Sequence, residues 1–194
     1  MEATDNDLML AVRYGDLDQF GVLFDRHHQR LFDFFYRLSG DSASSEDLVQ
    51  DVFLRMFRYR KTFDTSSEFR GWMYHIARTA RVDRFRSEKK DPLLKHDGTE
   101  KPASPLRVVE SDERSALLQR ALLQLPPDKR ELLILARFEE MKYEQIASLL
   151  NVEVGTVKVR VHRAIAELRE IFLRISGEKP KCAVKKSEKI LRTT

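Results

Sequence analysis

Two stretches of the chain combine basic side chains with aromatic or apolar ones, a mixture that suits non-covalent binding to nucleic acid. One is FRGWMYHIARTARVDRFRSEKK (69–90), which begins with aromatic residues and ends with an excess of arginine and lysine. The other is VGTVKVRVHRA (154–164), in which valines alternate with basic residues. Basic side chains neutralise phosphates, and exposed aromatic rings stack on unpaired bases.

The alternation within 154–164 is typical of a half-buried strand, but the apolar residues that follow it favour a helix. At about 100° per residue, one apolar stripe of such a helix comprises Val157, Val161, Ala164, Ile165, Leu168 and Phe172. The opposite face is basic, and free backbone N–H groups at the helix N-terminus can hold a phosphate. The residues expected to meet DNA in a major groove are Gly155, Thr156, Lys158, Val159, Arg160, His162 and Arg163.

The segment before this helix completes the pattern of a helix-turn-helix. It is YEQIASLL (143–150), whose apolar residues have helical spacing, and Asn151 follows where the chain must turn. Such a turn usually needs a positive φ, which Asn tolerates better than most residues. A solvated amphipathic helix would also have a basic face, but the preceding helix and turn favour DNA binding.

The segment 69–90 is predicted to be a helix with two unlike sides. Its inward side carries Phe69, Trp72, Met73, Ile76, Ala77 and Ala80. The arginines lie on the other side, where they can follow a phosphate backbone. Trp72 fits the core better than base stacking, whereas Tyr74 and His75 lie off the apolar stripe and are expected to be exposed. The preceding loop, TFDTSS (62–67), could accept a base, although a plain surface loop would look the same.

A third segment has the opposite charge. It is EDLVQDVFLRMFR (46–58), which presents Glu46, Asp47, Gln50 and Asp51 beside Phe53. An acidic and partly apolar surface would repel nucleic acid but would suit a basic protein partner. The alternative is an ordinary solvated helix N-terminus, where acidic residues are favoured by the helix dipole.

Helical signals position all three segments. Apolar residues at helical spacing run through 20–38 until Gly40, with Asp16 as a possible cap, and Ser44 with Asp47 forms a possible capping box for the next helix. Residues 87–111 lack an apolar period and are rich in Pro, Lys and Ser, as linkers are. The predicted fold is therefore all-α, with two small helical domains (1–88 and 112–175), a flexible linker (89–111) and a basic tail (176–194). Disorder is expected for the tail, with extra DNA or partner contact as the alternative.

Composition excludes several other classes of protein. The 194 residues carry a net charge of +4, which fits an anionic partner without requiring one. The single cysteine, Cys182, and the adjacent pair His27 and His28 offer no metal-ligand spacing, so neither a metal nor another cofactor is expected. Neither a phosphate-binding glycine loop nor a nucleophile motif is present, so an enzyme is not expected. Without a signal peptide or an apolar span, the protein is expected in the cytoplasm.

With these residues in view, the chain resembles bacterial sigma factors of the extracytoplasmic-function (ECF) type, within the sigma-seventy family. The core-polymerase-binding part of region 2 is similar to SSEDLVQDVFLRMFR (44–58), and the promoter-melting part is similar to FRGWMYHIARTARVDRFR (69–86). Region 4 is similar to LPPDKRELLILARFEEMKYEQIASLLNVEVGTVKVRVHRAIAELR (125–169). The order and spacing of these motifs around a linker make the resemblance specific.

The resemblance implies a sigma factor that binds core RNA polymerase, recognises promoters and helps to open DNA, without catalysis of its own. Against the clamp helices of the largest polymerase subunits it places Asp47, Gln50, Asp51 and Phe53. On the melted minus-ten element it places Phe63, Asp64, Thr65, Ser66, Ser67, Tyr74, His75, Arg78, Thr79, Arg81 and Arg84. On the double-stranded minus-thirty-five element it places the residues of 155–163 named above. An anti-sigma factor is a further implied partner.

Two positions depart from the family pattern. Thr79 stands where Asn is common, and Val159 stands where a small polar residue is common. Val159 can pack on a thymine methyl group but cannot donate a hydrogen bond. A stand-alone helix-turn-helix regulator is the alternative function, although it would leave the acidic segment and the aromatic-basic segment without a role.

Overall fold

The computed structural model describes residues 3–64, 68–90 and 113–177, and the regular structure in these ranges is entirely helical. The fold is all-α with two domains, as the sequence predicts. Most of the predicted linker, most of the predicted tail and three predicted site residues, Thr65, Ser66 and Ser67, lie outside the described ranges.

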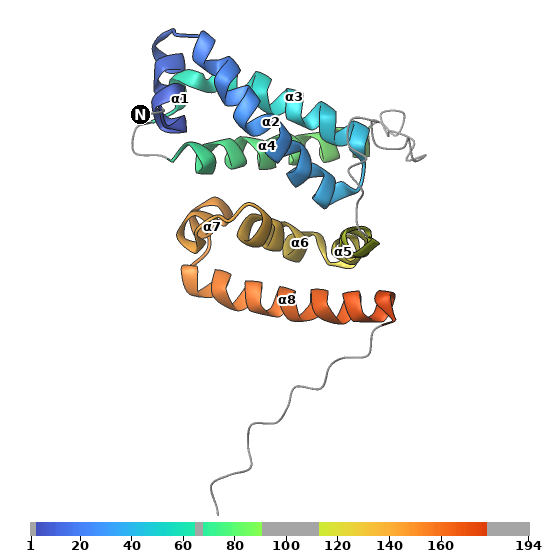
Figure 1. Ribbon diagram of the computed structural model, residues 1–194. Helices are drawn as coiled ribbons and strands as arrows, with labels where there is room; N and C mark the ends of the chain where they lie inside the picture. Colours follow the sequence, from blue (N-terminus) through green and yellow to red (C-terminus); the bar gives the residue numbers. More distant parts are fainter. Residues whose placement is uncertain (1–2, 65–67, 91–112, 178–194) are drawn as a thin grey trace, which may run out of the picture.

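The N-terminal domain is a bundle of four α-helices (Figure 1). They are α1 (Asp5–Tyr14), α2 (Asp18–Ser39), α3 (Ser42–Tyr59) and α4 (Phe69–Lys90), and the short 3-10 helix η1 (Arg60–Thr62) follows α3. Helix α2 packs on α1 and α3, and α3 also packs on α4. The centre of the bundle is filled by side chains without solvent exposure, among them Met9, Leu31, Phe34, Met56 and Met73.

Helix ends in this domain are set by short polar side chains and by glycines. Thr4 and Asp7 form a capping box at the start of α1. Gly40 ends α2 in the left-handed region at φ 76°, where a side chain would be strained. Two predicted caps are wrong. Helix α3 begins at Ser42, where the Asp41 carboxylate accepts from the Ser44 N–H at 3.2 Å. Asp16 accepts from the Gln19 side chain and does not cap α2, which begins without a side-chain cap in the described structure.

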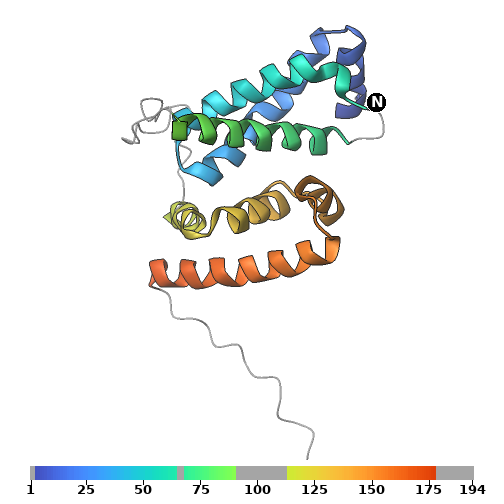
Figure 2. The same ribbon diagram turned by 180° about the vertical axis from the view of Figure 1, so that it is seen from behind.

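The C-terminal domain begins with α5 (Glu113–Gln124) and α6 (Pro127–Leu133), which continues as a π-helical turn, η4 (Ile134–Phe138). Helices α7 (Tyr143–Leu150) and α8 (Val154–Ser176) complete it. Both views show α5, α6 and α7 as a middle layer between the N-terminal bundle and α8 (Figures 1 and 2). Helix α8 packs on all three helices of this layer, so one of its sides faces away from the N-terminal domain.

The two domains lie against each other over a continuous interface. Helix α2 contacts α5, α6 and η4, and α4 contacts α7. At one edge, a Cβ added to Gly40 would lie 3.0 Å from the Leu123 Cδ1 atom, which shows how closely the backbone of one domain approaches the other.

Candidate nucleic-acid interface

Helices α7 and α8 form the predicted helix-turn-helix. Asn151 is left-handed at φ 52°, ψ 53°, as predicted, and the Val152 N–H donates to the Ala147 carbonyl at 3.0 Å. Val157, Val161 and Ala164 are buried against the rest of the domain, which confirms the helical period of this segment. One part of the predicted stripe is wrong: Ile165 is partly exposed and Ile171 is buried instead. Helix α8 continues past Leu168, and over this length the line of buried side chains shifts around the helix axis.

The outer face of α8 is basic and open to solvent. Lys158, Arg160, His162 and Arg163 are exposed, and within the described part of the chain none of them forms a hydrogen bond or an ion pair. Val159 is 50% exposed in the middle of this face, as predicted. Gly155 and Thr156 lie in the first turn, where backbone N–H groups are free to bind a phosphate. These groups together can read a major groove and hold its backbone.

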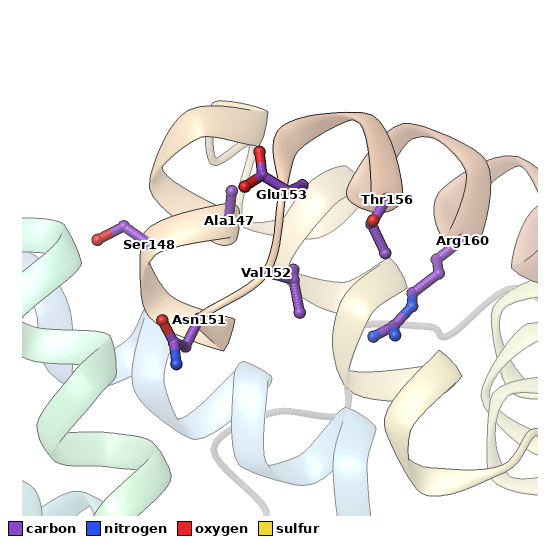
Figure 3. Close-up of a pocket in the computed structure, with 7 residues that line it drawn as sticks. All are labelled: Ala147, Ser148, Asn151, Val152, Glu153, Thr156 and Arg160. Carbon is purple, nitrogen blue, oxygen red and sulfur yellow. The ribbon is translucent and has the colours of Figure 1, made fainter.

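A pocket of about 480 Å³ lies beside this face, between the end of α7 and the first two turns of α8 (Figure 3). It is lined by Ala147, Ser148, Asn151, Val152, Glu153, Thr156 and Arg160. Most of these side chains can donate or accept hydrogen bonds, so the pocket extends the polar surface of the recognition helix toward α7. Two of them, Thr156 and Arg160, also belong to the predicted DNA-binding set.

The predicted minus-ten residues are split between the surface and the core. His75 and Thr79 are exposed on α4, and Asp64 is exposed before it. Phe63 and Tyr74 are completely buried, contrary to the predicted base contact and the predicted exposure. Phe63 packs edge-on against Trp72, with ring centroids 5.3 Å apart. Neither ring can stack on a base without leaving the core.

Tyr74 is buried because α4 has a second neighbour that the sequence pattern does not reveal. Its hydroxyl donates to the carboxylate of Glu139, which follows η4 in the other domain. Burial, together with the nearby negative charge of Glu139, raises the pKa of the Tyr74 hydroxyl far above its ordinary value, so Tyr74 remains a neutral donor.

Three arginines of α4 have acidic partners. Arg78 Nε lies 2.8 Å from Glu131 Oε1, and Arg81 Nη2 lies 3.1 Å from Glu131 Oε2. Arg84 Nη1 lies 3.2 Å from Asp47 Oδ2 on α3. Glu131, which belongs to α6, is only 4% exposed. The two acidic residues that meet α4 from the other domain, Glu131 and Glu139, are important members of this site that sequence reasoning did not find.

The acidic face of α3 is present, with one correction. Glu46, Asp47 and Gln50 are exposed, and Asp51 pairs with Arg55 one turn further along, at 3.0 Å. Phe53, however, is buried against Phe24, with ring centroids 4.8 Å apart, and so cannot face a partner as expected. The apolar side chain on this surface is Leu54, which is 68% exposed. Its helical spacing from Gln50 and Asp51 was the signal that could have identified it.

Groups that would point to other activities are not found in the described ranges. No cluster of three or more His, Cys, Asp or Glu residues there could hold a metal ion. No helix in these ranges is long and apolar enough to cross a membrane.

Comparison with known proteins agrees with the two-domain architecture. Sigma-70 region 2 matches residues 23–91, and Sigma-70, region 4 matches residues 115–168. The ECF RNA polymerase sigma factor SigW of Bacillus subtilis is 32% identical over 182 residues, covering 88% of this chain and 97% of SigW. RNA polymerase sigma factor CarQ of Myxococcus xanthus is 34% identical over 165 residues, covering 84% of this chain and 95% of CarQ.

A solved structure has the same fold. It is that of CnrH in complex with the cytosolic domain of CnrY, and it matches with a TM-score of 0.68 at 22% identity over 90% of this chain and 99% of that one. With both sigma regions matched in order and relatives aligned over nearly their full length, the chain belongs to the ECF RNA polymerase sigma factors of the sigma-70 family.

Proposed function

We propose that this sigma factor reads the minus-thirty-five element with the outer face of α8 and the minus-ten element with α4, while α3 binds core RNA polymerase. The observation that carries the proposal is the row of basic side chains on α8 that have no partner in the described structure. Three solvated cations and a histidine beside an exposed valine offer both phosphate neutralisation and an apolar contact for a base edge. Binding to an anionic duplex would give these basic side chains the partners that they lack in the described structure.

The minus-ten contacts are assigned to α4 and the loop before it. Exposed His75 and Thr79 are the side chains available for bases, and Thr79 already uses its hydroxyl to donate to the His75 carbonyl at 3.0 Å. Arg78, Arg81 and Arg84 supply phosphate contacts once their acidic partners are displaced. Asp64 belongs to the same surface, and Thr65, Ser66 and Ser67 stay part of the proposal by family resemblance.

The polymerase contact is assigned to Asp47, Gln50 and Asp51. Their helix offers carboxylates and the exposed Leu54 side chain on one surface, which suits a partner with basic groups around an apolar position. We add Leu54 to this set in place of Phe53. The domains that carry these functions are proposed to span 1–88 and 112–175, with region 2 and region 4 activities respectively.

An anti-sigma factor is the proposed regulator. Two solved structures with a similar fold each contain a bound partner. CnrH is bound to the cytosolic domain of CnrY. RpoE from Bartonella quintana, which matches with a TM-score of 0.63, is bound to the anti-sigma factor NepR. We further propose that the protein acts in the cytoplasm as a non-enzymatic subunit. A stand-alone regulator is disfavoured because region 2 matches a domain that such a regulator would not need.

The function is tested by mixing the purified protein with core RNA polymerase and a promoter library, then sequencing the transcript starts. Promoter-specific initiation is expected, and the absence of both core binding and initiation would overturn the proposal. In the same assay, Asp51→Arg should abolish core association because it reverses the charge at the centre of the α3 surface. Glu170→Arg, an exposed charge reversal on α8, is the matched control and should keep it. Association unchanged in Asp51→Arg would remove α3 from the polymerase interface.

A further inference from the structure

We propose that this sigma factor closes on itself when it is free of polymerase, and that Glu131 then occupies the place of a promoter phosphate on Arg78 and Arg81. The closed form masks the minus-ten surface but leaves the minus-thirty-five surface open. The inference rests on the proposed assignment of these two arginines to minus-ten DNA.

The contact of Glu131 with α4 has the form of a phosphate contact. Each carboxylate oxygen accepts from a different guanidinium group, at 2.8 Å from Arg78 and 3.1 Å from Arg81. The two arginines are three residues apart, so they lie side by side on one face of α4. A phosphate held by the same two donors would need the space that the Glu131 carboxylate fills, and the two anions therefore exclude each other.

Glu139 forms a second anchor between the domains. Its carboxylate accepts from the Tyr74 hydroxyl and lies 3.1 Å from Arg30 Nε, and its backbone carbonyl accepts from Arg70. The residue is only 2% exposed, so these groups replace the water that it loses. Every one of these partners belongs to the N-terminal domain. Separation of the domains would return Glu139 to solvent without breaking a contact inside its own domain.

Backbone carbonyls at helix ends complete the closed interface. Gln119 on α5 donates to the Tyr36 carbonyl at 2.9 Å, and Arg130 on α6 donates to the Leu38 carbonyl. In the opposite direction, Arg78 donates to the Leu149 carbonyl at 2.9 Å. Carbonyls in the last turn of a helix lack an i+4 partner within the helix, so the bonds to Leu38 and Leu149 satisfy acceptors that are otherwise left to water, whereas the Tyr36 carbonyl also accepts from the Gly40 N–H at 2.8 Å.

The chemistry of the interface is that of a reversible contact. The groups named in the preceding paragraphs are charged or polar, and water can solvate them again when the domains part. Two buried guanidinium nitrogens, Arg70 Nε and Arg81 Nε, have no hydrogen-bond partner in the described structure. These two nitrogens lose water on closure and gain no hydrogen bond in return, which lowers the stability of the closed form. A nucleic-acid phosphate can therefore compete with Glu131 for the arginines.

The recognition helix is not part of this mask. Helix α8 lies on the far side of the middle layer from the N-terminal domain (Figures 1 and 2). Its exposed residues Lys158, Val159 and Arg163 therefore stay accessible while Arg78 and Arg81 are occupied. Duplex recognition can thus precede melted-strand recognition in the free protein.

Closure is tested by single-molecule energy transfer between dyes on Asp18→Cys and Ala166→Cys in a Cys182→Ser background. Both dye positions are exposed, one in each domain. The doubly labelled protein with an unsubstituted domain interface should show mainly high energy transfer between the two dyes. Glu131→Gln keeps the shape of the side chain but removes the anion, and it should shift the population to low transfer. The matched control is Glu167→Gln, which removes an equal charge from a pair with Lys129 inside the C-terminal domain and should change nothing.

Masking is tested with the same variants and a fluorescent single-stranded 20-mer of mixed sequence. If the open form is about a tenth of the population, full opening tightens apparent binding by about tenfold. Glu131→Gln should show this gain and Glu167→Gln should not. High transfer retained in Glu131→Gln, or opening without a gain in affinity, would overturn the inference. A further experiment separates the masking by Glu131 from the assignment of the two arginines to minus-ten DNA. Holoenzyme carrying Arg78→Ala and Arg81→Ala is tested for initiation, and a defect at the minus-ten element upholds the proposed function even when the masking test fails.

Discussion

Helices α4 and α8 both carry arginines along one face, yet the two faces differ in what surrounds them. On α4, the described structure pairs Arg78 and Arg81 with Glu131. On α8, Arg160 and Arg163 are exposed and have no partner among the described residues. Similar sequence patterns thus produce one surface that is ready for an anion and one that already holds an anion. The arrangement of the neighbouring helices makes the difference: α4 has helices of both domains on two sides, whereas the neighbours of α8 all lie on one side (Figures 1 and 2).

The largest effect should come from placing an acidic side chain on the buried side of α8, compared with the same side chain on its exposed side. Val161→Asp would bury a carboxylate without a partner in the C-terminal domain, a cost that exceeds the few kcal/mol by which a small domain is stable. We expect loss of the α8 fold, measured by circular dichroism on the isolated 112–175 fragment, which should fold in its unsubstituted form. Val159→Asp introduces the same group on the exposed side. It should leave the fold intact while abolishing binding to minus-thirty-five DNA, and a folded Val161→Asp fragment would contradict the assignment of the faces.

A second pair of substitutions compares the arginines directly. Arg78→Ala leaves Glu131 buried with one partner, so it should lower the free energy of unfolding by roughly 1 to 3 kcal/mol. Arg163→Ala should change it by less than about 0.5 kcal/mol because no partner in the described structure is lost. Urea denaturation gives both values.

For binding to duplex DNA, the order of the two effects should reverse: Arg163→Ala should have the larger effect and Arg78→Ala the smaller. Arg163→Ala should weaken binding to a minus-thirty-five duplex by about ten- to a hundredfold, the range for one good base contact. Arg78→Ala should leave duplex binding unchanged. Equal losses at both elements for Arg163→Ala would mean that this side chain has a structural role.

The smallest effect concerns two histidines in different surroundings, His27 in the N-terminal core and His162 on the exposed face of α8. Burial lowers the pKa of His27 although Asp5 Oδ2, 2.7 Å from its Nε2, opposes the shift. The unfolded chain therefore binds a proton more readily than the folded one, and stability should be complete above about pH 6.5 and decrease as the pH falls below it. Thermal unfolding at pH 7.5 and 5.5 should show a smaller pH dependence for His27→Gln than for the unsubstituted protein. The matched control is His162→Gln, which should keep the original dependence, and equal slopes for all three proteins would contradict the proposed role of His27.

The sequence predicted best what depends on nearest neighbours along the chain. The left-handed Asn151 and the buried Val157 and Val161 follow from local backbone preference and from one helical period. The exposed Val159 follows from the same period. Such features need only one partner surface, which the pattern itself defines.

The errors occur where a helix is covered on a second side. Tyr74 lies off the main apolar stripe of α4, but the C-terminal domain buries it against Glu139. Phe53 and Phe63 belong to the core because aromatic neighbours from other elements enclose them. Hydrophobic periodicity contains no information about which distant helix covers the opposite side, so neither the buried Tyr74 nor the pairing of Arg78 could be derived from it.

The separation in sequence between Tyr74 and Glu139, 65 residues, has a consequence for the newly made chain. At a synthesis rate of about 5 to 20 residues per second, the ribosome adds Glu139 roughly 3 to 13 s after Tyr74. Until then, α4 lacks the carboxylate of Glu139 that later covers Tyr74. In the proposed closed form, the minus-ten surface of the nascent chain is therefore open until Glu131 and Glu139 have been translated, and the arrival of these two carboxylates is what masks it.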